Sequence, residues 1–142
     1  MRASELARAM GMPSRSYEHL ENGSGRITYE RVVAFAEATD SDPIAIMSTL
    51  WTGDPDFAVR CADNKLMSIM MIAVMELGDD LGADLSYLDA GTLVGGFTRL
   101  TRDFAQHVRK RETFAEEWLR NGEERLRSGA APSLARLRPA RT

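Results

Sequence analysis

The 142-residue chain has few of the side chains that support covalent or metal chemistry, because it holds one cysteine and two histidines. With Cys61 alone, the chain can form neither an internal disulfide nor a cysteine metal cluster. His19 and His107 are too few and too far apart to indicate a nucleophile with its base or a zinc site. We interpret the adjacent acidic pairs, Asp79–Asp80 and Glu116–Glu117, as solvated surface residues rather than as catalytic acids and bases. The sequence therefore predicts a protein that is not an enzyme and has no cofactor and no bound metal.

The chain also lacks an apolar run long enough to cross a membrane. The most apolar stretch, LMSIMMIAVMEL from Leu66, is too short to span a bilayer. The start, MRASELARAMG, has no continuous apolar segment of the kind that a secretory signal needs. We interpret the single Cys61 as a small core residue. Together these absences predict a cytoplasmic protein without a membrane partner.

The chain as a whole has no excess of basic charge, since its net charge is −3. Its overall charge therefore does not indicate a nucleic-acid partner. Residues 1–52 hold five arginines against seven acids, and residues 53–98 hold two basic residues against eight acids. Residues 99–142 hold eleven basic residues against six acids. The basic charge is therefore concentrated at the C-terminal end.

The alternation of a β-strand is absent as well, and helical spacing runs through the chain, which predicts an all-α fold. Thr28, Asp42 and Asp54 are the expected N-caps, the last two followed by proline, and Ser86 with Asp89 resembles a capping pair. Helices are expected at residues 3–11, 14–21, 28–39, 43–52 and 55–81, the last interrupted near residues 63–64, followed by a long C-terminal helix to about residue 127.

Three parts are expected along this helical chain. Residues 1–52 read as four short helices, and Gly53 begins a boundary. Residues 53–128 read as a helical dimerisation or interaction part, and residues 129–142 as a flexible basic tail. In the fourth short helix the apolar positions are Ile44, Met47, Leu50 and Trp51.

The second part carries two apolar surfaces that need a cover. From Leu66 to Leu77 the sequence is apolar almost all round a helix, so it must be covered on more than one side. The long helix carries an a/d seam formed by Leu93, Phe97, Leu100, Phe104, His107, Arg111, Phe114 and Trp118. We predict a homodimer through residues 64–118. Two alternatives stay open: the methionine-rich stretch can form an adaptable site for an effector or a partner helix, and the seam can pack within one chain.

The clearest motif is LARAMGMPSRSYEHLENG, residues 6–23. Ala7 is small enough for two helices to cross closely, Gly11 allows a sharp turn, and Tyr17 and Leu20 can clamp the second helix on the first. With Glu21 before Asn-Gly, this pattern resembles the helix-turn-helix of the Cro and lambda-repressor family, also called XRE. The resemblance continues loosely to about residue 50, and residues 53–142 show none.

The resemblance implies that the second motif helix lies in the major groove of double-stranded DNA. By position, Ser14, Arg15 and His19 would contact base edges, with Arg15 gripping guanine in a bidentate pair. Ser16 and Asn22 match positions that face phosphate, which sets register rather than sequence preference.

The chain departs from the family pattern in two ways. Ala3 stands where the family uses a glutamine, and the first helix of the domain is missing, together with the arginine that pairs with the residue matching Glu21. A buried glutamate without that partner is costly or becomes protonated. Three accounts stay open: a start upstream of Met1, a later segment or second subunit that fills the gap, or a degenerate region that no longer binds DNA.

The sequence as a whole therefore predicts a sequence-specific DNA-binding transcriptional regulator, a repressor by occlusion, that acts as a dimer on paired half-sites. The alternative is a helical protein-interaction module, or an antitoxin-like partner of a second protein, with a degenerate DNA-binding region.

Overall fold

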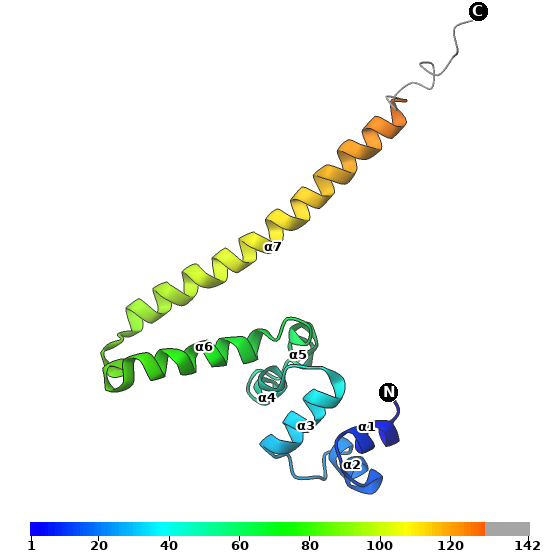
Figure 1. Ribbon diagram of the computed structural model, residues 1–142, viewed down its shortest axis with the longest axis vertical. Helices are drawn as coiled ribbons and strands as arrows, with labels where there is room; N and C mark the ends of the chain where they lie inside the picture. The colour runs from blue at the N-terminus through cyan, green and yellow to red at the C-terminus, as the bar shows by residue number, and fades with distance from the viewer. Residues whose placement is uncertain (130–142) are drawn as a thin grey trace, which may run out of the picture. The chain divides into compact units, whose positions relative to one another are not determined.

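A computed structural model describes residues 1–129, and in that range every regular element is a helix and there is no strand (Figure 1). The elements are α1 (Ala3–Ala9), α2 (Ser14–Glu21), α3 (Tyr29–Thr39), α4 (Pro43–Thr52), α5 (Pro55–Cys61), α6 (Leu66–Leu81), the 3₁₀ helix η1 (Gly82–Tyr87) and α7 (Ala90–Arg127). The predicted all-α fold with a long C-terminal helix is confirmed. The predicted basic tail, 129–142, lies outside the described residues except for Gly129.

Three helix starts follow the predicted caps. Thr28 Oγ1 accepts a hydrogen bond from the Arg31 amide at 3.3 Å, which opens α3. Asp42 caps α4 and Asp54 caps α5, each followed by a proline in the first turn, where a missing amide hydrogen costs nothing. These residues confirm that local sequence sets where α3, α4 and α5 begin.

The predicted interruption near residues 63–64 is confirmed. The chain leaves the helix after Cys61 and re-enters at Leu66, with Lys65 in the left-handed conformation at φ 55°. The predicted capping pair of Ser86 and Asp89 is wrong. Asp89 is itself the N-cap of α7 and accepts from the backbone and hydroxyl of Thr92 at 2.9 and 2.7 Å, so that helix begins three residues later.

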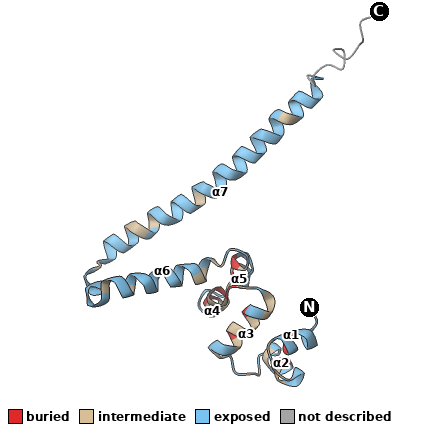
Figure 2. Ribbon diagram, viewed as in Figure 1, coloured by how far each residue is buried: buried red, intermediate tan, exposed pale blue. Residues whose placement is uncertain are grey.

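The chain divides into two compact units, of which the first is Met1–Leu85. In this unit α1 packs on α2 and α3, α3 packs on α4, and α4 packs on α5 and α6. Two buried clusters result, one around Leu6, Ala7 and Tyr17 and one around Ala45, Ala58 and Cys61. Packing therefore continues past residue 53, where the sequence suggested a division. Figure 2 shows the buried positions of this unit in red.

The core face of α4 is not formed by its largest apolar residues. Leu50 and Trp51 are exposed, and the buried residues of the helix are Ala45 and Ser48. Small side chains let α5 and α6 approach α4 closely, so the large residues at the end of the helix are left facing outward. Ile44 and Met47 are half-buried.

Asp42 is fully buried and joins two helices. Its Oδ1 accepts from the amides of Ile44 and Ala45 at 3.1 and 3.2 Å, as the cap of α4. Its Oδ2 accepts from the amides of Met67 and Ser68 at 2.8 and 3.2 Å, and Ser68 Oγ donates to Oδ1 at 2.6 Å. One carboxylate therefore caps the first turns of both α4 and α6.

A second polar link ties the same helix start to the end of α3. Lys65 Nζ lies 3.0 Å from Asp40 Oδ1 and also donates to the Asp40 carbonyl oxygen. Together with Asp42, this contact fixes the start of α6 in the first unit.

The second unit begins at Ser86, and its described part consists mainly of α7. No residue of α7 is buried, and Figure 2 shows most of the helix exposed, with a few half-buried positions. No helix among residues 1–129 has both the length and the apolar content needed to cross a membrane.

Candidate nucleic-acid interface

The first two helices form a tight helix-turn-helix pair. Leu6 and Ala7 of α1 are buried against Tyr17 of α2, and Phe35 of α3 packs behind them. Between the helices Gly11 has φ +66°, which favours glycine, and the Met12 amide donates to the Ala7 carbonyl at 3.0 Å. The turn and the buried contacts together fix the direction in which α2 presents its outer face.

Tyr17 anchors α2 to this pair. Its side chain is 7% exposed, and Leu20 is half-buried on the same side of the helix. Burial raises the pKa of the Tyr17 hydroxyl, and the nearby Glu21 carboxylate raises it further. The inward face of α2 is therefore the one predicted from sequence.

Four of the five predicted DNA-contacting residues are exposed: Ser14, Arg15, His19 and Asn22. At 100° per residue, Arg15, His19 and Asn22 lie on one face of α2, opposite Tyr17. Ser16 is half-buried. The structure thus brings three of the predicted residues together on an outward face, while Ser14 begins the helix on its flank.

His19 is held in place by the loop that follows α2. Its Nδ1 lies 3.2 Å from Ser24 Oγ, and Ser24 Oγ also donates to the His19 carbonyl at 3.1 Å. These contacts leave Nε2 as the ring nitrogen that is not engaged by Ser24. A ring fixed in this way can offer one directed hydrogen bond to a ligand.

Gly25 is a supporting residue that the sequence reasoning missed. Its amide donates to the His19 carbonyl at 2.7 Å, and a Cβ added there would lie 2.9 Å from the Leu20 backbone. Any larger residue would push the loop away from the end of α2. The neighbouring Gly23, at φ +72°, was predicted as the helix stop, but close approach at Gly25 leaves no local signal in the sequence.

The charges around α2 are of both signs. In the described part of the chain, Arg2, Arg8, Arg15 and Arg26 form no ion pair, so each guanidinium is available to an external anion. Glu18 and Glu21 are exposed along one flank of α2 and oppose phosphate there. A duplex would therefore have to approach from the Arg15 side.

The expected burial of Glu21 is wrong. Its side chain is exposed at the end of α2, because the helix packs through Tyr17 and Leu20 and turns the last residue outward. The cost of a buried carboxylate without an arginine partner does not arise at this position.

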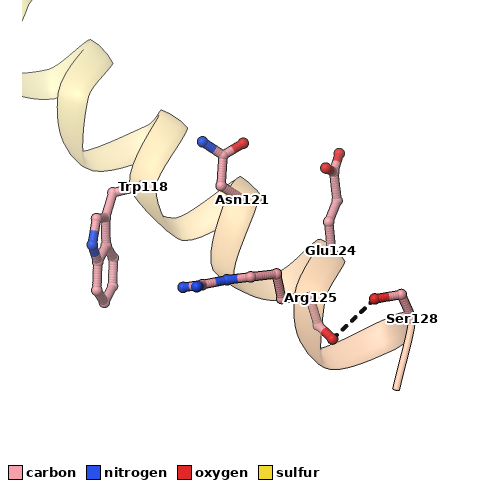
Figure 3. Close-up of a pocket in the computed structure, with 5 residues that line it drawn as sticks. All are labelled: Trp118, Asn121, Glu124, Arg125 and Ser128. Carbon is pink, nitrogen blue, oxygen red and sulfur yellow. Dashed lines mark hydrogen bonds between the residues drawn. The ribbon is translucent and has the colours of Figure 1, made fainter. Parts of the chain in front are cut away.

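Outside the first unit, a hollow with a volume of about 720 Å³ lies on one flank of α7. It is lined by Trp118, Asn121, Glu124, Arg125 and Ser128, all from the end of that helix. Figure 3 shows Trp118 and Arg125 extending from the same side of the helix. A hollow formed by one helix flank is open to solvent, unlike the concave pockets that hold small molecules.

Among residues 1–129, no three histidine, cysteine or acidic side chains gather where they could hold a metal ion.

Comparison with protein-family models, curated proteins and solved structures finds no match to this chain.

Proposed function

We propose that the chain is a sequence-specific DNA-binding transcriptional regulator that reads the major groove with α2 and acts as a dimer. In this proposal the dimer acts as a repressor, because a protein bound at a promoter blocks access to it. The observation that carries the proposal is the face formed by Arg15, His19 and Asn22, which is exposed on a helix whose opposite side is anchored by Tyr17. A DNA-reading helix needs this combination of rigid support and free polar side chains.

The roles of the side chains follow from their hydrogen-bonding groups. Arg15 presents a planar fork that matches O6 and N7 of guanine. Because the Ser24 hydroxyl proton is donated to the His19 carbonyl, Nδ1 of His19 donates to Ser24 Oγ, and Nε2 of the neutral ring can accept one hydrogen bond. Ser14 begins α2, and its exposed hydroxyl can make one hydrogen bond to a base edge. Ser16 lies in the first turn of α2 and Asn22 at its end, where a hydroxyl and an amide suit phosphate contacts that set the register on the duplex.

Replacement of Arg15 by alanine tests the proposed groove contact. The preferred duplex is first selected from a random pool with the full chain, and each base pair is then varied. Arg15→Ala should relax the preference at one position by roughly 5- to 150-fold, because one bidentate contact is worth about 1–3 kcal/mol. Arg102→Ala is the matched control, since it removes the same charge from an exposed position on α7. Equal base preference in the wild type and Arg15→Ala would exclude this groove assignment.

The second candidate is a protein-interaction module or an antitoxin-like partner of another protein. The exposed apolar side chains of α6, such as Ile72 and Met75, favour it. The two candidates differ in their response to salt. A DNA complex weakens steeply as salt rises because phosphate contacts release counterions, whereas apolar packing does not.

A further inference from the structure

The long helix α7 carries an apolar stripe that none of its own residues covers. Its a and d positions step by three and four residues, and their apolar members range in exposure from 37% at Leu93 to 70% at Phe114. The other apolar members are Phe97, Leu100, Phe104 and Trp118. Two polar residues, His107 and Arg111, interrupt the stripe between Phe104 and Phe114.

The two edges of this stripe differ in charge. The g edge carries Asp103, Lys110, Glu117 and Glu124. The e edge carries Val94, Thr101, Val108, Ala115 and Gly122, none of which is charged. Asp103 and Lys110 are exposed and form no ion pair within the described chain. All of the charge that can select a partner therefore lies along one edge.

A parallel pair of α7 helices does not suit this arrangement. In a parallel pair each seam residue faces its own copy, so Arg111 would meet Arg111 and His107 would meet His107. Like charges in a seam are repulsive. The charged g edge would also run along the uncharged e edge, so Asp103 and Lys110 would find no opposite charge.

We propose that α7 pairs with α7 of a second copy of this chain in antiparallel orientation, centred between Ala105 and Gln106. This inference rests on the proposed dimer and defines its interface. In the antiparallel pair the g edges face each other, so Asp103 of each copy lies opposite Lys110 of the other. Opposite charges across such an edge select orientation and register.

The same register covers the whole stripe. Leu93 lies opposite Trp118 of the second copy, Phe97 opposite Phe114, Leu100 opposite Arg111 and Phe104 opposite His107. Each polar seam residue thus meets an apolar one, and the aliphatic stem of arginine can lie along that surface.

One competing antiparallel register is less favourable. Centred seven residues later, it pairs Lys110 with Glu117 but brings Asp103 against Glu124. It also leaves Leu93 beyond the end of the second helix, because α7 ends at Arg127. Like charges and an uncovered leucine both disfavour that alignment.

A charge-swap cycle tests the register by sedimentation of the full chain without DNA. Asp103→Lys and Lys110→Asp should each weaken self-association by roughly tenfold, because two ion pairs become two repulsive contacts. The double variant should recover most of the wild-type affinity. Arg102→Glu and Glu116→Lys, at exposed positions away from the stripe, are matched controls and should change little. If the double variant is no better than the single ones, the register is overturned.

Distances between spin labels test the orientation independently. With Cys61→Ala as background, single cysteines at Thr98 and Arg120 should give separations between copies whose components along the helix axis are about 22 and 44 Å, from a rise of 1.5 Å per residue. Equal short separations at both sites would mean a parallel pair. A monomer with no distance between copies would mean that another part of the chain or another protein covers the stripe. Either result overturns the proposal, and neither involves DNA, so a failure here remains distinct from a failure to bind DNA.

Discussion

At the scale of single residues, Asp42 contributes most to joining the parts of the first unit. A buried carboxylate is costly unless its oxygens are satisfied, and here amides from two helix starts and the Ser68 hydroxyl satisfy them. Burial raises the pKa of this carboxyl, but the hydrogen bonds from Ser68, Ala45 and Met67 outweigh it, so the pKa is lower than the ordinary aspartate value.

Removal of this carboxylate should cost much more than removal of an ordinary cap. Asp42→Ala leaves the first-turn donors of α4 and α6 without an acceptor, and we expect a loss of about 3 kcal/mol in the free energy of unfolding. Thr28→Ala is the matched control, since Thr28 caps one helix through the Arg31 amide only. That change should cost about 1 kcal/mol. Equal losses by urea denaturation would contradict the double role of Asp42.

The lowered pKa of Asp42 also predicts how stability depends on pH. Because the pKa is lower in the folded chain than in the unfolded chain, protons bind preferentially to the unfolded state. The stabilisation is therefore complete well above the unfolded value of about 4 and is lost as pH falls through the lower folded pKa. The stability difference between the wild type and Asp42→Asn should shrink below about pH 4. A difference that stays constant from neutral pH into this range would show that the charge does not contribute.

At the scale of the helices, sequence predicted where elements begin better than which face is buried. Asp42 before Pro43 was enough to place the start of α4, because a cap is a local signal. Leu50 and Trp51 are apolar and yet exposed, because burial depends on which helices approach and how closely. The contact of Asp42 with Met67 joins residues 25 positions apart, and no local pattern announces it.

The apolar helix α6 is expected to take part in association. Ile72 is 56% exposed in the single chain. Ile72→Glu should leave the free energy of unfolding within about 0.5 kcal/mol of the wild type, as for other exposed positions. It should weaken self-association by roughly tenfold or more, since a charge would be buried without a partner. Gln106→Glu, an added charge outside the α7 stripe, is the control. Unchanged sedimentation of Ile72→Glu would remove this part of α6 from the interface.

At the scale of the whole molecule, the candidate site was predicted more fully than its support. The Leu6–Gly23 motif predicted the α1–α2 pair and the outward face with Arg15, because residue spacing defines the faces of a helix. The motif did not predict the hydrogen bonds that Ser24 and Gly25 make to His19, because these depend on how the loop folds back on α2.

The uneven distribution of charge along the chain affects how it can bind DNA. The first 52 residues are slightly acidic, and the basic excess lies in residues 99–142. Specific binding would therefore depend on a few arginines near α2, and two copies would be needed to accumulate enough phosphate contacts. This is why dimer formation and DNA binding are expected to be linked in this protein.

The measurement that tests the central claim most directly is a fluorescence anisotropy titration of the full chain at two salt concentrations. The labelled duplex is DNA from upstream of its own coding region, and a random duplex is the competitor. We expect saturable binding that the random duplex displaces poorly. The affinity should fall about a thousandfold between about 50 and 200 mM salt if six phosphates are contacted. No binding, or binding that does not respond to salt and does not distinguish the two duplexes, would contradict the account of this chain as a sequence-specific regulator.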